Sequence, residues 1–137
     1  MTSREKQLIR ESFLSVREVA GPLSLLFYGR LFAMEPGLRP MFQGDIAKQG
    51  MKLMEMLTAV VDNLEQVETL TPVLQAMGQR HAGYGVVARH YELVEAALLW
   101  SMGQALGAEF DAEVRAAWRG VIGTVSREMQ EGARVIS

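Results

Sequence analysis

The sequence contains no cysteine and only two histidines among its 137 residues. Without cysteine the chain forms no disulfide, and it offers no thiolate to zinc, to an iron–sulfur cluster or to a nucleophilic mechanism. Neither sign of charge dominates, since 14 basic and 16 acidic residues give a net charge of −2. The basic residues are scattered along the chain, so we expect no nucleic-acid partner.

The sequence also lacks an apolar run with the length of a signal peptide or a membrane span. The charged segment 1–6 leads directly into an amphipathic pattern. A chain of 137 residues is long enough to bury one core together with a cofactor. We therefore expect one domain over residues 1–137, with no membrane partner and a cytoplasmic location.

No segment alternates apolar and polar residues over the length of a strand, whereas helical spacing recurs throughout. Thr2 and Glu5 have the spacing of a capping box at the start of a first helix, and Gly21-Pro22 ends it. The further predicted helices are residues 22–34, a short turn over 36–42, residues 47–63, the stretch from a capping Thr71 to Gly83, residues 91–106, and a last helix capped by Asp111. The sequence thus predicts an all-α protein.

His81 ends an apolar stripe that also contains Val73 and Met77. A histidine on such a face is more often a packed core residue than a metal ligand, so the stripe leaves both interpretations open. The other histidine, His90, stands at a predicted helix start beside Tyr91, and we expect it at the surface. His81 is therefore the candidate ligand of this chain.

Gln49 begins a second apolar stripe that continues through Leu53, and Tyr28 shares a predicted inner helix face with Leu25 and Phe32. Each polar side chain also fits an ordinary boundary position, with its polar end in water. A histidine ligand and a polar side chain on the metal's other face are, however, the minimum for reversible ligand binding to haem iron.

A set of short segments follows a known pattern in order along nearly the whole chain: 26–32, 35–36, 39–42, Gln49 with Leu53, 62–65, 70–74, 78–81, 85–87, 90–91, and Trp118 with Gly123. These segments resemble the globin domain of flavohaemoglobins and single-domain bacterial haemoglobins, including neuroglobin-like and thermoglobin-like forms. The resemblance implies a globin fold, in which about seven or eight helices surround a haem pocket.

Carried over to this sequence, the resemblance implies that His81 is the proximal ligand of a b-type haem (heme b, iron protoporphyrin IX) and that Phe42 packs on the porphyrin. Tyr28 and Gln49 then face the open site. The remaining implied pocket residues are Leu53 on the distal wall, Lys52 at a propionate, Val86 at the haem edge and Tyr91 beneath the haem. Because the chain has no cysteine, the cofactor is held without a thioether link.

Tyr28 and Gln49 would donate hydrogen bonds to a dioxygen ligand, which carries partial negative charge, and would favour it over carbon monoxide. Two donors favour slow oxygen release. Slow release in turn favours tight oxygen binding, or the reaction of bound dioxygen with nitric oxide to give nitrate, as the function. Flavohaemoglobins carry a reductase domain after the globin that these 137 residues do not contain, so we expect that activity to need a separate reductase. Alternatively, Gln49 bonds Tyr28 instead of the ligand. Oxygen storage or delivery, a gas sensor and a haem-free helical module are the other hypotheses.

The resemblance also places a glutamate in the last helix near the proximal histidine, and such a residue makes that histidine a stronger electron donor. The corresponding position here is Ala133, and Glu131 would point to the opposite side of a regular helix. We therefore expect no peroxidase-like activation.

Overall fold

The computed structural model describes residues 1–42 and 44–135, and its regular elements are all helical. In chain order they are α1 (Ser3–Glu18), α2 (Ala20–Met34), the 3-10 helix η1 (Pro36–Met41), α3 (Ile46–Asp62), η2 (Leu64–Leu70), α4 (Thr71–Gly83), α5 (Ala88–Leu106), η3 (Gly107–Glu109) and α6 (Ala112–Val135). Within these described residues there is no strand, and the all-α prediction is confirmed.

Side-chain caps fix the starts of three helices. The Thr2 hydroxyl accepts from the Glu5 N–H and the Glu5 carboxylate accepts from the Thr2 N–H, both at 3.1 Å, which is the predicted capping box. Asp111 accepts from the first turn of α6 at 2.9 Å, as predicted. Asp45 accepts from the Ala47 N–H at 2.9 Å, and this cap starts α3 at Ile46, one residue before the predicted start.

Two predictions about helix starts are wrong. Thr71 is already the first residue of α4 and caps nothing, because η2 runs directly into α4 and Leu70 takes the N-cap position. Helix α5 begins at Ala88, ahead of the predicted start, because the His90 Nδ1 accepts the N–H of Val87 at 3.0 Å. His90 is only 5% exposed, so its predicted surface position is also wrong.

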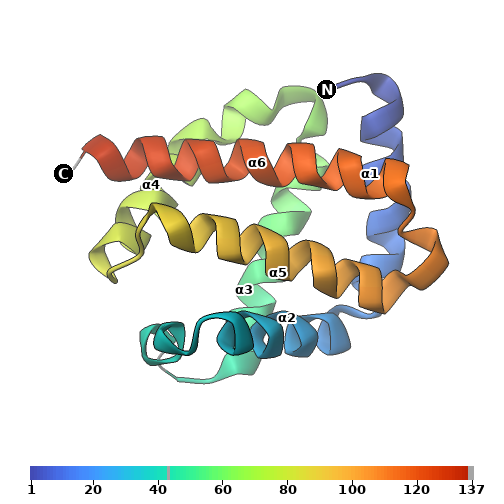
Figure 1. Cartoon of the computed structure of the whole chain (residues 1–137). Coiled ribbons are helices and arrows are strands. Elements are labelled where there is room, and N and C mark those ends of the chain that lie inside the picture. The colour runs from blue at the N-terminus through green and yellow to red at the C-terminus, as the bar shows by residue number, and fades with distance from the viewer. Residues whose placement is uncertain (43, 136–137) are drawn as a thin grey trace.

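In Figure 1, α6, α5 and α2 lie one below another, and α1 and α3 run across them. Helix α2 packs on α5 and α3, while α4 packs on α6. The core between α1 and α6 is centred on Trp118, which is fully buried, and its Nε1 donates to the Ser12 hydroxyl at 2.8 Å. Ser12 in turn donates to the Leu8 carbonyl at 2.7 Å, so both polar groups of this contact are satisfied.

Two helix faces differ from those predicted. Leu25 is 69% exposed, and α2 instead buries a face that contains Leu23 and Phe27. Helix α2 carries apolar residues almost all round, so spacing alone does not select its inner face. Val73 is 56% exposed because α4 packs on α6 through the adjacent face that contains Leu74.

Of the helices in the described part of the chain, none has the length and apolar character needed to cross a bilayer.

Candidate functional site

His81 lies near the end of α4 and is half-buried. Its Nδ1 is 2.7 Å from the main-chain carbonyl oxygen of Met77, one turn earlier in the same helix. Because a carbonyl only accepts, Nδ1 carries a hydrogen, which leaves Nε2 as the ring nitrogen that can bind a metal. This bond fixes both the tautomer and the ring orientation that a metal-ligating histidine requires.

The loop after α4 folds back onto the His81 turn. The Val86 N–H donates to the His81 carbonyl at 3.1 Å, and the turn is possible because Gly85 has φ +94°. Gly85 also faces the end of the Met41 side chain, with 3.7 Å between the Met41 Cε and the position of a Cβ built on the glycine. The structure thus places Val86, half-buried, beside the candidate ligand and brings the segment before Phe42 to the same edge.

Tyr28 lies on the buried face of α2 with only 5% of its surface exposed. Its ring packs against three phenylalanines, with centroid distances of 4.8 Å to Phe27, 5.5 Å to Phe42 and 6.1 Å to Phe32. Phe42 also packs edge-on against Phe32 at 5.3 Å. Phe42, half-buried, is therefore held next to Tyr28, as a residue that packs against a flat cofactor on this side would be.

The Tyr28 hydroxyl has no hydrogen-bond partner among the residues that the structure describes. Among the same residues, every side-chain oxygen or nitrogen that is fully buried has a hydrogen-bond partner. Because the Tyr28 hydroxyl has none, its oxygen is not fully buried and borders open space. Burial raises the pKa of Tyr28 to about 12. The group therefore stays protonated at ordinary pH and is available as a donor.

Helix α3 brings Gln49, Leu53 and Lys52 to the site. Gln49 and Leu53 are half-buried, whereas Lys52 is exposed. In the described structure no hydrogen bond joins the Gln49 amide to Tyr28 or to another side chain. Helix α3 approaches α2 closely beside Gln49, because a Cβ on Gly50 would lie 2.9 Å from the Ser24 side chain. Ser24 is one turn before Tyr28, so this crossing brings both predicted donors to one region.

The helices that carry the two halves of the site pack little against each other. Helix α3 packs mainly on α2, and α4 packs on α6. The apolar side chains that α3, α4, α5 and the C-cap of η1 contribute around the site are packed against the core yet only partly buried. They are Phe42, Leu53, Met56, Met77, Tyr91 and Val94. This arrangement suits an apolar group inserted between α3 and α4, because such a group would cover these surfaces.

Tyr91 is half-buried in the first turn of α5, and burial raises the pKa of its hydroxyl. The neighbouring His90 uses its Nδ1 to cap α5, which is a structural role. On α6 the Glu131 side chain is 53% exposed, and its carboxylate lies 3.1 Å from the Arg134 guanidinium. The sequence analysis did not predict the hydrogen bond from the His81 ring to the Met77 carbonyl. The signal was present, because residues four apart on a helix are neighbours.

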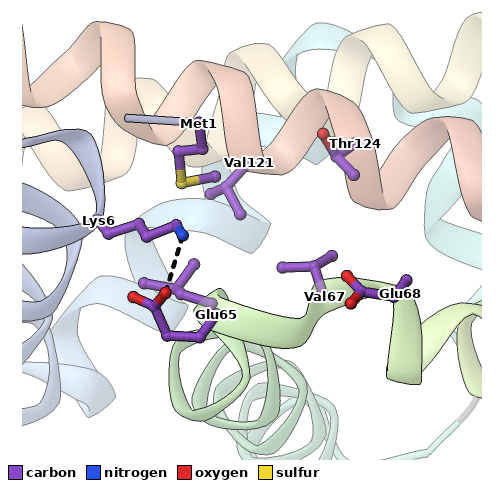
Figure 2. A pocket seen from close by; sticks show the side chains of 8 residues that line it. Met1, Lys6, Glu65, Val67, Glu68, Val121 and Thr124 are labelled. Carbon is purple, nitrogen blue, oxygen red and sulfur yellow. Dashed lines mark hydrogen bonds and ion pairs between the residues drawn. The ribbon is translucent and has the colours of Figure 1, made fainter. Parts of the chain in front are cut away.

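Two hollows elsewhere on the molecule contain none of the predicted site residues. The first, of about 280 Å³, lies between α1, η2 and α6 and is crossed by an ion pair from Lys6 to Glu65 at 3.0 Å (Figure 2). The second, of about 670 Å³, is a groove between α2 and α3 beside the exposed side chains of Leu25 and Met51. In the described part of the chain no cluster of three or more histidine, aspartate or glutamate side chains forms a metal site.

A family model of the globins matches residues 25–129, which is well over half of the chain. The chain belongs to the globin family. Globins bind haem, and membership of the family indicates haem-based binding of small gas molecules such as dioxygen. The predicted globin fold and the likeness to bacterial and neuroglobin-like globins are confirmed.

Among the relatives of this globin, neuroglobin-1 of Oncorhynchus mykiss and neuroglobin of Danio rerio are each 27% identical, over 96% of this chain and 92% of their own. An engineered carbene transferase from Rhodothermus marinus, which carries the assignment of nitric oxide dioxygenase, superposes with a TM-score of 0.88 at 23% identity, covering 99% of this chain and 95% of its own. A bacterial globin from Campylobacter jejuni superposes with a TM-score of 0.86 at 21% identity over 98% of both chains. At these identities the structural likenesses show the fold.

Proposed function

We propose that this globin holds a b-type haem through His81, binds dioxygen tightly and combines it with nitric oxide to form nitrate. The observation that carries the proposal is the Tyr28 hydroxyl. It is attached to a buried ring, stays protonated, borders open space and has no partner among the described residues. A hydroxyl that is held on a buried ring, borders open space and has no protein partner is free to donate a hydrogen bond to a bound ligand, and this supports a role for Tyr28 in ligand binding.

The residues present fit the cofactor. His81 offers Nε2 because its Nδ1 is bonded to the Met77 carbonyl, and the partly buried apolar side chains supply walls for a porphyrin. When bound, haem supplies an iron that binds diatomic gases and changes oxidation state. Phe42 and Leu53 then exclude water, Val86 and Tyr91 contact the porphyrin, and the exposed Lys52 pairs with a propionate.

Tyr28 and Gln49 determine which gas is retained. A hydrogen bond to a partly charged acceptor is worth about 1.5–3 kcal/mol, and dioxygen accepts more charge density than carbon monoxide does. Both donors therefore slow the release of dioxygen and leave carbon monoxide less affected. The similarity to a solved structure that carries the assignment of nitric oxide dioxygenase also supports an oxidative role.

The reaction consumes one nitric oxide, one dioxygen and one electron, and its product is one nitrate ion. Nitrogen is oxidised and dioxygen is reduced, so the electron that completes the balance has to be returned in every turnover. A separate reductase supplies this electron and is the proposed protein partner. The apolar walls contributed by Phe42 and Leu53 keep competing water from the retained gas.

The cofactor is tested by absorption spectroscopy of the purified protein after addition of hemin. We expect a Soret band that shifts on reduction and again with dioxygen or carbon monoxide, and that His81→Ala removes or alters. His90→Gln is the matched control, because glutamine retains an acceptor for the α5 cap and the residue is not a proposed ligand. A protein that stays colourless with hemin, or a His81→Ala variant with the wild-type spectrum, would refute the proposal.

The reaction is tested by mixing the reduced, oxygenated protein with nitric oxide in a stopped-flow instrument. Nitric oxide dioxygenation predicts rapid conversion to the ferric spectrum and one nitrate formed per haem. Fast oxygen release with slow reaction toward nitric oxide would instead favour storage or delivery. Addition of an electron donor with a general flavin reductase should then sustain nitric oxide consumption.

A further inference from the structure

Two glycines bring the main chains of α4 and α6 into contact. A Cβ built on Gly78 would overlap the Met129 carbonyl and lie 2.8 Å from the Met129 Cα. A Cβ built on Gly132 would lie 2.6 Å from the carbonyl carbon of Gln75. Carbon atoms in ordinary contact are about 3.5–4.0 Å apart. Neither position therefore accepts a side chain unless the two helices separate.

The contact is reciprocal, because each glycine faces the main chain of the other helix. Gln75 and Gly78 are one turn apart on α4, and Met129 and Gly132 are one turn apart on α6. Beside them the Gln75 amide donates to the Glu128 carboxylate at 3.4 Å. Figure 1 shows α4 against the C-terminal half of α6. Two main-chain contacts one turn apart fix both the distance and the rotation of α4 on α6.

This contact lies directly beside the candidate haem ligand. His81 follows Gly78 within one turn of α4, and its ring is bonded to the carbonyl of Met77, the neighbour of Gly78. The ring therefore moves with α4 as a unit. Resting on the proposed role of His81 as iron ligand, we propose that Gly78 and Gly132 are positioning residues that set the place of His81 relative to the haem.

An alanine at either glycine displaces α4 from α6 by a distance on the order of 1 Å, since that is the shortfall from ordinary carbon contact. His81 is carried with it, so its bond to iron lengthens or tilts. Loss of the outer residues that orient a metal ligand weakens metal binding about 10- to 100-fold. We expect Gly78→Ala and Gly132→Ala to accelerate the transfer of hemin to apomyoglobin by about tenfold or more.

A spectroscopic measurement separates positioning from a general loss of stability. The iron–histidine stretching band of the reduced protein, measured by resonance Raman, should shift in both alanine variants. Gly83→Ala on α4 and Gly120→Ala on α6 are the matched controls, because a Cβ at either position meets no atom within 4 Å apart from its chain neighbours and the nearby backbone of its own helix. Alanine has a higher helix propensity than glycine in the two variants and in the two controls alike. Helix propensity therefore cannot produce a difference between the variants and their controls.

A second arm removes the link between the ligand and α4. In His81→Gly, imidazole added to the solution replaces the missing ring without being attached to the helix. Gly78→Ala in this background should leave the iron–imidazole band where His81→Gly alone has it. If Gly78→Ala shifts the iron–imidazole band as much as it shifts the iron–histidine band in the protein that retains His81, the substitution deforms the pocket itself. That result would overturn the positioning role.

Hydrogen exchange of the haem-loaded wild type tests the contact even where an alanine variant does not fold. The amides of residues 77–81 should exchange more slowly than those of the exposed end of α4, and rapid exchange throughout would overturn the inference. Wild type that takes up no hemin refutes the proposed function. The positioning role alone is refuted if the wild type shows an iron–histidine band that depends on His81, while Gly78→Ala and Gly132→Ala show the same band and the same hemin transfer as Gly83→Ala and Gly120→Ala.

Discussion

Replacement of Tyr28 by phenylalanine removes one oxygen atom from the proposed ligand pocket. The ring remains held by Phe27 at 4.8 Å and by Phe42 at 5.5 Å. Because the hydroxyl has no partner among the described residues, no protein hydrogen bond is broken within that part of the chain. The variant should therefore be about as stable as the wild type, since the hydroxyl borders open space and its removal leaves no buried partner without a bond.

The expected change in ligand binding follows from the strength of one hydrogen bond to a partly charged acceptor. About 1.5–3 kcal/mol corresponds to an increase of roughly 10- to 150-fold in the dissociation rate of dioxygen. Gln49 remains as a second donor, so the lower half of this range is expected. The dissociation rate of carbon monoxide should change much less, because that ligand accepts a weaker hydrogen bond.

Both dissociation rates are measured by stopped-flow displacement, with carbon monoxide displacing dioxygen and nitric oxide displacing carbon monoxide. Tyr84→Phe is the matched control, since that tyrosine is 67% exposed and loses the same atom. The reasoning is refuted if Tyr28→Phe binds haem normally but releases dioxygen within about twofold of the wild-type rate. Equal acceleration for both gases would indicate a change in access to the pocket instead of a lost hydrogen bond.

Two further predictions concern buried polar groups. Ser12→Ala should lower the free energy of unfolding in urea by about 1–3 kcal/mol because the buried Trp118 Nε1 loses its acceptor, whereas Ser15→Ala, whose bond to Glu109 is exposed, should cost less than about 0.5 kcal/mol. Burial raises the pKa of Tyr28 from 10.0 to about 12, so the folded state keeps its proton after the unfolded chain has lost it. The unfolding free energy should therefore fall as the pH rises from about 10 to about 12, and Tyr28→Phe should flatten that part of the curve in alkaline titrations followed by circular dichroism.

The helix pattern could be predicted because local signals agree with the final structure. Thr2 with Glu5, and Asp111, have capping bonds that involve only neighbouring residues, so their sequence spacing was sufficient. His90 was misplaced because its Nδ1 caps α5 in a way that common capping preferences do not anticipate. Leu25 was misplaced because a helix that is apolar all round has several equivalent faces, and only packing selects one.

The sequence alone determined that this chain is an all-α globin with one candidate proximal histidine, because periodicity, caps and family motifs are local properties of the chain. The tertiary structure alone decided the chemical state of the site. Only packing buries the Tyr28 ring and leaves its hydroxyl at the edge of open space, and only the close approach of α3 to α2 at Gly50 and Ser24 brings the helix of Gln49 against the helix of Tyr28. The contact of Gly78 and Gly132 likewise joins segments far apart in sequence. Burial, pKa and close approach depend on neighbours from other helices, which no local pattern specifies.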